Sequence, residues 1–411
     1  MLVTAGRNRL PSATSDLVAV AFIAVGVALR FIWALLIHPP FEYVYSDMAG
    51  YVSRGAMIAS GASLTRYDAF QPTGTQTLLA LPFSIFGSGG AGMWAAAVLW
   101  GALSSATLFF AWRLARSWLS PWAAALVAAL FALWPLHVFG SGYFLSETPS
   151  LAFLTAALWL MTAASPRTRL AGGALGALAI ACRPELALNL VIAAVVAARR
   201  HGRGTMAAVA CGFVVVALAV VAWNSSIANR PVLLSQNAGF VFFEGQCDAR
   251  LVTGGYASRP FTIGSPARLQ RHAGREFAFP GTPVYDQAFF FRHGFDCIAD
   301  DGLGHVRTLA ANVFDMTATS VPWPEADEHG AVRDIARISN LAYSLLLPVL
   351  VLLGVVAVRR GHTALGQPLM QLTTPFVLAL IFLGEPRYRA LYDVFGLMLL
   401  AALVATAGRR T

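Results

Sequence analysis

The chain has 411 residues, of which 57% are hydrophobic and only 12% are charged, and its mean hydropathy is +0.64. No soluble domain of this length needs so much apolar surface, so the composition indicates a polytopic membrane protein. The net charge of +9 comes from arginines that cluster at alternate ends of the apolar segments. This pattern argues for a topological origin of the charge and against nucleic acid as a partner.

The apolar segments predict about ten membrane crossings. They lie at residues 17–37, 91–112, 121–138, 144–164, 170–182, 186–198, 205–223, 339–358, 364–383 and 391–407. The first segment is expected to be a retained helix, because Arg30 lies inside it and no small-residue cleavage motif follows. Residues 73–86 are apolar but short and contain Pro82, so we expect a partly embedded helix that does not cross.

The charges orient these crossings. On the side of the two termini the loops hold thirteen arginines and one acidic residue, Asp16, whereas the other side holds sixteen arginines and nineteen acidic residues. The positive-inside rule then predicts that both termini lie in the cytoplasm. The opposite loops are expected to lie in the periplasm.

Two long polar stretches fall on the periplasmic side. Within the first, residues 38–72, the apolar spacing of residues 45–61 predicts an amphipathic helix lying on the membrane, with Ser46 or Asp47 as its N-cap. The second, residues 224–338, is a large periplasmic loop without a strong helical period.

These stretches divide an all-α polytopic fold into three parts. A transmembrane catalytic module is expected at residues 1–223, the periplasmic loop at 224–338, and the C-terminal transmembrane helices at 339–411. No sequence repeat is evident, which weakens the case for a transporter built from duplicated halves.

The cysteines agree with this topology. Cys247 and Cys297 both lie in the large loop, where an oxidising compartment favours a disulfide, and the alternative is two unpaired thiols. Histidine and cysteine show no metal-ligand spacing, so neither a metal nor another cofactor is expected.

Charged groups recur at the periplasmic ends of the predicted crossings. Ionisable residues at membrane depth are expensive and usually functional. The groups are Asp47; Ser146-Glu147-Thr148; Arg183-Pro184-Glu185; and Glu385-Pro386-Arg387-Tyr388-Arg389.

Each group also has a structural alternative. Asp47 could only cap its helix, and Glu147 could only favour a helix start. Arg183 could snorkel to the interface, and Arg387 and Arg389 could face lipid headgroups. All four groups fall on one face, which favours a common site.

The ordered set of motifs resembles the C-type (GT-C) membrane glycosyltransferases. It is most similar to the bacterial branch of the dolichyl-phosphate-mannose protein mannosyltransferase family, which also resembles the lipid A aminoarabinose transferases. The motifs are Asp47-x3-Tyr51-x4-Ala56-x-Ile58-x2-Gly61; Gln71-Pro72-Thr73-Gly74 with Leu81-Pro82-x3-Phe86-Gly87; Tyr143-x2-Ser146-Glu147-Thr148; Gly172-x3-Gly176-Ala177-x5-Arg183-Pro184-Glu185; and Glu385-Pro386-Arg387-Tyr388.

The resemblance implies transfer of a sugar from a polyprenyl-phosphate donor to a hydroxyl acceptor outside the cytoplasm. Asp47 is the candidate general base and Glu147 a second catalytic candidate that orients its surroundings. The donor phosphate is expected to bind Arg387 first, then Arg183, with Tyr388 adding a hydroxyl. Further site candidates are Tyr51, Arg54 and Glu385.

The sequence therefore predicts an inverting, mannosyltransferase-like hexosyl- or pentosyltransferase of the cell envelope. Its expected partners are the lipid-linked donor, a glycan, lipid or protein acceptor, and the bilayer. A transporter or flippase for a lipid-linked or anionic substrate is the main alternative, because it would also need arginine within the membrane.

Overall fold

The computed structural model describes residues 12–247, 250–253, 261–263, 276–279, 282–317 and 330–407. The two chain ends, whose cytoplasmic placement was predicted, lie outside these ranges, as do parts of the large loop.

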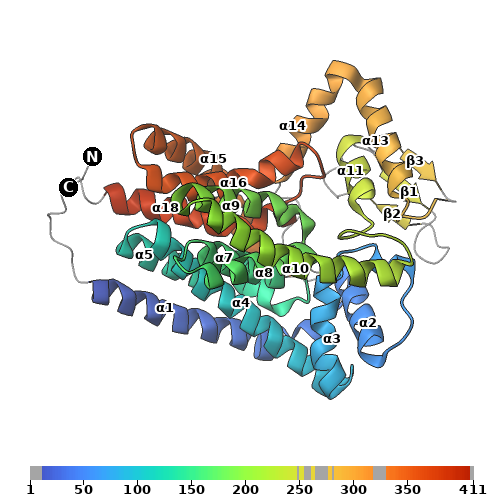
Figure 1. Ribbon diagram of the computed structural model, residues 1–411, viewed down its shortest axis with the longest axis horizontal. Coiled ribbons are helices and arrows are strands. Elements are labelled where there is room, and N and C mark those ends of the chain that lie inside the picture. Colours follow the sequence, from blue (N-terminus) through green and yellow to red (C-terminus); the bar gives the residue numbers. More distant parts are fainter. Residues whose placement is uncertain are drawn as a thin grey trace.

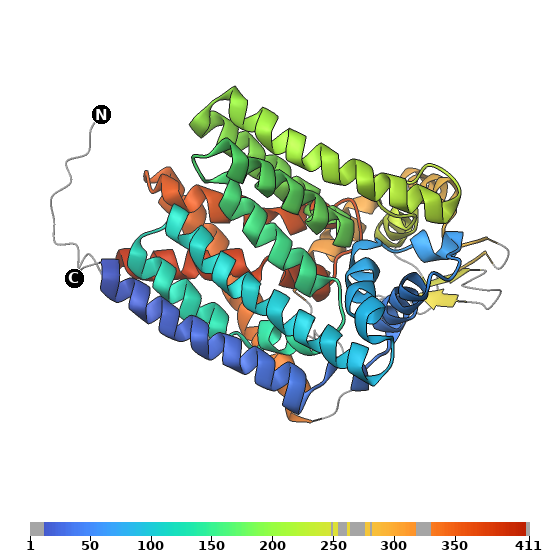
Figure 2. The ribbon, with the colours of Figure 1, turned by 60° about the horizontal axis from the view of Figure 1, so that its bottom comes forward.

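Long helices lie side by side and form a bundle (Figure 1, Figure 2). Each coincides with an apolar segment expected from the sequence, and the all-α polytopic fold class is confirmed. The bundle helices are α1 (Ser12–Ile32), α4 (Gly90–Trp118), α5 (Pro121–Leu133), α7 (Glu147–Met161), α8 (Pro166–Cys182), α9 (Ala187–His201), α10 (Arg203–Ala228), α15 (Ala331–Arg359), α16 (Gly366–Ala379) and α18 (Asp393–Ala407).

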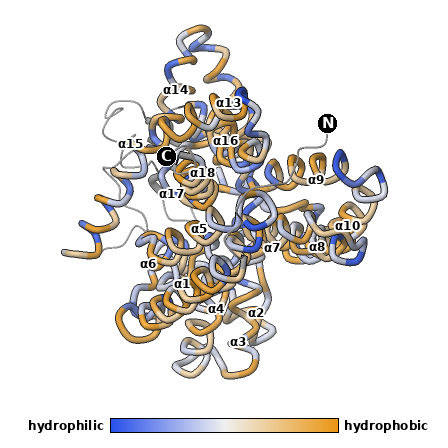
Figure 3. Tube along the Cα trace, turned by 90° about the vertical axis from the view of Figure 1, so that its left-hand side faces the viewer, coloured by the Kyte–Doolittle hydropathy of each residue, from blue (hydrophilic) through white to orange (hydrophobic). Residues whose placement is uncertain are grey.

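The hydropathy of these helices is that of a multi-pass membrane protein. Figure 3 shows that the bundle is mostly hydrophobic, and outward-facing apolar side chains such as Leu17, Val215 and Leu345 are 70%, 65% and 67% exposed. A protein surrounded by water would bury such side chains, so their exposure suits a surface that faces lipid.

Among the described residues, four single helices are long and apolar enough to cross a membrane, and they are the ones that contain α1, α4, α10 and α15. A fifth crossing is possible if α5 and α6 (Pro135–Phe139), which are bent by 58°, form one span. The other bundle helices do not meet that length and hydropathy criterion, so the predicted count of about ten crossings stays a prediction.

The bend between α5 and α6 has an identifiable cause. Pro135 has no backbone N–H to continue α5, which leaves carbonyl groups at its end without helical partners. Arg30, fully buried in α1, donates hydrogen bonds to the carbonyls of Phe131 and Ala132 at 3.0 and 3.2 Å. The arginine inside the first span therefore supplies hydrogen bonds to carbonyl groups at the end of α5.

The smaller elements gather at one end of the bundle, opposite the start of α1 and the end of α18 (Figure 1). They come from the first loop, the large loop and the segment before α18. They are α2 (Ser46–Ser60), α3 (Gly74–Phe86), α11 (Ala238–Cys247), α13 (Gln287–Asp301), α14 (His305–Asp315) and α17 (Pro386–Ala390), with strands β1 (Arg250–Thr253), β2 (Phe261–Ile263) and β3 (Glu276–Phe279).

The large loop has more structure than its sequence suggested. Its strands form one sheet in the order β2-β1-β3, antiparallel between β1 and β2 and parallel between β1 and β3. Although its sequence has no strong helical period, α11, α13 and α14 lie here, and α15 begins at Ala331, inside the predicted loop. Cys247 and Cys297 form a disulfide that joins α11 to α13.

Two glycines bring distant segments together around the site. A Cβ atom at Gly74, the first residue of α3, would lie 2.7 Å from the backbone of Ala181 near the end of α8. One at Gly245 in α11 would lie 2.6 Å from the backbone of Phe382, which follows α16. Only glycine permits these approaches, which place the first loop beside α8 and the large loop beside α16.

Candidate active site

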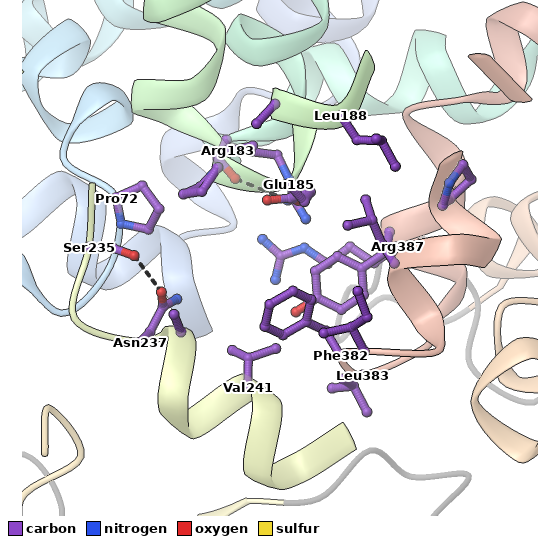
Figure 4. Close-up of a pocket in the computed structure, with 18 of the residues that line it drawn as sticks. Pro72, Arg183, Glu185, Leu188, Ser235, Asn237, Val241, Phe382, Leu383 and Arg387 are labelled. Carbon is purple, nitrogen blue, oxygen red and sulfur yellow. Dashed lines mark hydrogen bonds and ion pairs between the residues drawn. The ribbon is translucent and has the colours of Figure 1, made fainter. Parts of the chain in front are cut away.

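A cavity of about 570 Å³ lies where the first loop, the α8–α9 break, the start of α11 and the α16–α17 segment meet (Figure 4). Its lining includes a charged cluster of Asp47, Arg183, Glu185 and Arg387. The rest of the lining is largely apolar. The apolar part includes Leu188 and Val191 of α9, Val241 of α11, Val377 and Leu378 of α16, and Ile381, Phe382 and Leu383.

Asp47 lies in the first turn of α2 and receives two hydrogen bonds. Gln71 Nε2 donates to its Oδ1 at 2.7 Å, and Arg387 Nη1 donates to its Oδ2 at 2.6 Å. The side chain is 30% exposed, so the carboxylate is held in place at the cavity yet reachable.

The capping alternative for Asp47 is wrong. The N-cap of α2 is Tyr45, and no side chain makes a capping hydrogen bond there. Ser46 adopts a φ of 49°, which is unusual for a residue with a side chain. Both carboxylate oxygens of Asp47 are instead bonded to residues that follow far along the chain.

Gln71 is itself held by Arg54, which donates from Nη2 to the Gln71 side chain and from Nε to Gln76. Arg54 is 7% exposed and does not line the cavity. It acts on the site through Gln71 and Asp47. Tyr51, one turn after Asp47, lines the cavity directly.

Glu147 lies behind the cavity wall at the start of α7, with 5% of its side chain exposed. It joins two arginines from different parts of the chain. Arg387 donates to both carboxylate oxygens of Glu147, and Arg183 Nη1 lies 2.8 Å from Oε1. Ser146 Oγ adds a hydrogen bond at 3.2 Å. Glu147 does not line the main cavity, so this geometry suits a positioning role.

Arg183 is the C-cap of α8, where Pro184 ends the helix. Only 5% of the residue is exposed, so it does not snorkel to the membrane surface. Its Nε pairs with Glu185, and its guanidinium carbon lies 5.2 Å from the ring centre of Tyr388. Among the described residues Nη2 has no hydrogen-bond partner, which leaves one donor available at a residue that lines the cavity.

Arg387 is the centre of the network. Burial disfavours its charged form, but the charges of Glu147 and Asp47 outweigh that cost and hold its pKa well above the ordinary value. Burial, and then the charge of Glu385, raise the pKa of the neighbouring Tyr388, whose phenol stays protonated and can donate. The site therefore keeps a fixed cation beside a neutral hydroxyl.

Two further predicted residues lie outside the cavity lining. Glu385 is the N-cap of α17, where its carbonyl accepts from the N–H of Tyr388 at 3.1 Å. Arg389 does not face lipid headgroups: it is fully buried, donates to Asn340 at 2.7 Å and pairs with Asp393 at 3.3 Å. That alternative is wrong for Arg389.

Some cavity residues were not among the predicted site residues. Gln71 and Glu185 belong to motifs identified in the sequence. Their place in those motifs could have marked them as site residues, whereas their residue types alone could not. Asn237 and Ser235 line the opposite wall and share a hydrogen bond of 2.7 Å (Figure 4). No group of three or more His, Cys, Asp or Glu side chains within the described ranges is arranged to hold a metal ion.

Residues 71–225 match the family model described as dolichyl-phosphate-mannose-protein mannosyltransferase. The resemblance to the C-type membrane glycosyltransferases is confirmed. The matched range contains Glu147 and Arg183, whereas Asp47 and Arg387 lie on either side of it.

Solved structures show a distant likeness to this chain. The oligosaccharyltransferase AglB of Archaeoglobus fulgidus, in complex with an inhibitory peptide and a dolichol-phosphate, is 12% identical, with a TM-score of 0.47 over 94% of this chain and 50% of that chain. ArnT of Cupriavidus metallidurans bound to undecaprenyl phosphate is 14% identical, with a TM-score of 0.39 over 93% of this chain and 76% of that chain.

The chain spans about half the length of the archaeal oligosaccharyltransferase. No curated protein sequence matches it. Because both TM-scores lie below 0.5, the family match and the motifs, and not the structural likeness, support the assignment to the C-type glycosyltransferases.

Proposed function

We propose that the protein transfers a sugar from a polyprenyl-phosphate donor to an acceptor hydroxyl on the periplasmic face of the bacterial inner membrane. The observation that carries this proposal is a cavity lined by two arginines and a reachable carboxylate, with a lining that is otherwise largely apolar. A lipid phosphate has the matching chemistry, with an anionic head for the arginines and an apolar tail for the rest.

The proposed reaction uses these groups as follows. The acceptor oxygen attacks the anomeric carbon of the sugar, and the bond between that carbon and the phosphate oxygen breaks. The hydroxyl proton passes to Asp47, and the lipid phosphate leaves with its electron pair. One attack of this kind inverts the configuration at the anomeric carbon.

Arg387 connects donor binding to the base. Its Nη1 holds Oδ2 of Asp47, while Gln71 holds Oδ1. A phosphate oxygen that takes over the Nη1 donor releases Oδ2 for the acceptor proton and leaves the carboxylate oriented by Gln71. Arg183 Nη2 and the Tyr388 hydroxyl supply further donors to the phosphate.

The test uses purified protein in nanodiscs with a radiolabelled polyprenyl-phosphate hexose and cell-envelope material as the source of acceptor. The wild type should release lipid phosphate and label the envelope material. Asp47→Asn keeps the shape and one acceptor oxygen but removes the proton acceptor, so turnover should fall by roughly 10² to 10⁴-fold.

Asp68→Asn is the matched control, because Asp68 lies in the same loop but only caps a short 3₁₀ turn through Thr65. That variant should retain wild-type turnover. Near-normal transfer by Asp47→Asn, with normal expression, would exclude Asp47 as the base. Movement of the lipid across the bilayer without release of lipid phosphate would favour the transporter alternative.

A further inference from the structure

A second pair of arginines lies beside the cavity, on the other side of the chain that forms its wall. Ser235 and Asn237 line the cavity, and Gln236 between them is fully buried. Arg66 Nε donates to Oε1 of Gln236 at 3.3 Å, and Arg230 Nη2 donates to the same oxygen. Two donors on one oxygen place the guanidinium groups within about 6 Å of each other.

The surrounding residues hold this pair in position. The guanidinium carbon of Arg66 lies 4.2 Å from the ring centre of Tyr285, and Tyr67 contacts the edge of that ring with centroids 4.7 Å apart. Gln236 is fixed from both directions, because its Nε2 donates to the carbonyl of Arg66 and its backbone N–H to the end of the same 3₁₀ turn. Stacking covers the face of the Arg66 guanidinium and leaves its edge available.

No carboxylate neutralises the pair within the described residues. Arg183 and Arg387 in the cavity each contact acidic side chains, whereas the contacts of Arg66 and Arg230 within the described ranges are with neutral groups. The nearby acids serve other purposes: Asp68 accepts hydrogen bonds from Thr65. Asp286 caps α13 through the N–H of Phe289.

The pair also has donors to spare. Arg66 uses only Nε, and Arg230 uses only Nη2, which also approaches the carbonyl of Tyr285 at 3.5 Å. The remaining guanidinium nitrogens have no hydrogen-bond partner among the described residues. Both side chains are half-buried, which suits a solvent-accessible anion that several fixed N–H groups can reach.

We propose that Arg66 and Arg230 bind an anionic group of the acceptor, so that the acceptor is a glycan or glycolipid headgroup carrying a phosphate or a carboxylate. This inference rests on the proposed glycosyl transfer. The acceptor hydroxyl enters the cavity past Ser235 and Asn237, while the anionic group of the same molecule is held one residue away on the outer side of Gln236.

The experiment measures binding of acidic glycan probes, so its result does not depend on whether the protein transfers a sugar. The full protein in phosphatidylcholine nanodiscs is titrated by thermophoresis with an oligogalacturonate, with a phosphorylated glucosamine disaccharide, and with a neutral dextran fragment of similar length. The wild type should bind at least one acidic probe and not the dextran, and binding should weaken as salt is raised.

The double variant Arg66→Gln and Arg230→Gln should lose about ten- to a hundredfold in affinity for the acidic probe, because charge-assisted hydrogen bonds are lost. The control is Arg292→Gln, an exposed arginine on α13, which should bind as the wild type does. Equal binding by the double variant, or no binding of either acidic probe to the wild type, would overturn the proposal.

A further arm separates the acceptor from the bilayer as the source of the anion. Discs with phosphatidylglycerol should leave acidic-probe binding within about threefold of its value at the same ionic strength. Loss of binding in those discs would mean that lipid headgroups occupy the pair, which contradicts an acceptor site. Release of lipid phosphate by the wild type tests the transfer reaction separately, so failure of either idea is recognisable.

Discussion

Replacement of Arg387 by lysine tests whether the guanidinium fork is needed. Arg387 uses three nitrogens at once, with Nη1 on Asp47 and both Nε and Nη2 on Glu147. A lysine ammonium keeps the charge but cannot reproduce the planar fork, so at least one charge-assisted hydrogen bond is lost. Such a bond contributes about 1.5–3 kcal/mol, and the lower half of that range applies because the side chain is 25% exposed.

A loss of about 2 kcal/mol corresponds to a fall of about thirtyfold in kcat/KM. The donor KM should rise because the phosphate is present in the bound donor, and kcat should fall because the phosphate gains charge in the transition state. Arg387→Ala should be more severe, since it also leaves the buried Glu147 with Arg183 as its remaining cationic partner.

The assay is the initial rate of lipid-phosphate release in nanodiscs across a range of donor concentrations. Thermal unfolding of each variant shows whether the fold is intact, and Arg292→Lys on the exposed face of α13 is the charge-preserving control. A kcat/KM for Arg387→Lys within about threefold of the wild type would refute the assignment of Arg387 to the donor phosphate.

Two further predictions concern the topology and the large loop. A reporter that is active only outside the cytoplasm should be active when fused after Asn237 and silent when fused after His201, and the reverse pattern would invert the membrane orientation on which the proposed reaction depends. Thiol labelling of the denatured, non-reduced protein should modify neither Cys247 nor Cys297, whose bridge closes a loop with a sequence separation of 50 residues and is assigned roughly 4 kcal/mol by the chain-entropy model; labelling of both would exclude the disulfide.

The sequence predicted the structure well where one physical requirement, an apolar surface facing lipid, determines it. Apolar length and the position of prolines and arginines were enough to locate the bundle helices, because lipid tolerates little else. The large loop was not legible for the opposite reason. Its helices α11 and α13 pack against each other through phenylalanines such as Phe240 and Phe290, so apolar residues point in several directions and no single helical face stands out.

The sequence singled out Asp47, Glu147, Arg183 and Arg387 by type and location, and the structure brings them together, but their pairings were not predicted. Asp47 was predicted to be the general base, and its structural alternative was a cap of α2, since an acid at the start of a helix often caps it. Arg387, 340 positions later, takes that carboxylate instead. Nothing local in the sequence distinguishes these outcomes, because the competing partner comes from a segment that only the tertiary fold brings near.

Arg389 shows how the site is fixed from the protein side. It shares the short helix α17 with Arg387, yet it is fully buried while Arg387 reaches the cavity. Its guanidinium donates to Asn340 and Ser344 of α15, pairs with Asp393 of α18, and lies 4.8 Å from the ring centre of Tyr343. A helix of five residues is too short to be stable alone, so these contacts, and not helix propensity, determine where α17 lies. Arg387 thus contacts Glu147 and Asp47 from a short helix that is anchored to two bundle helices, which would preorganise it for the phosphate binding proposed above.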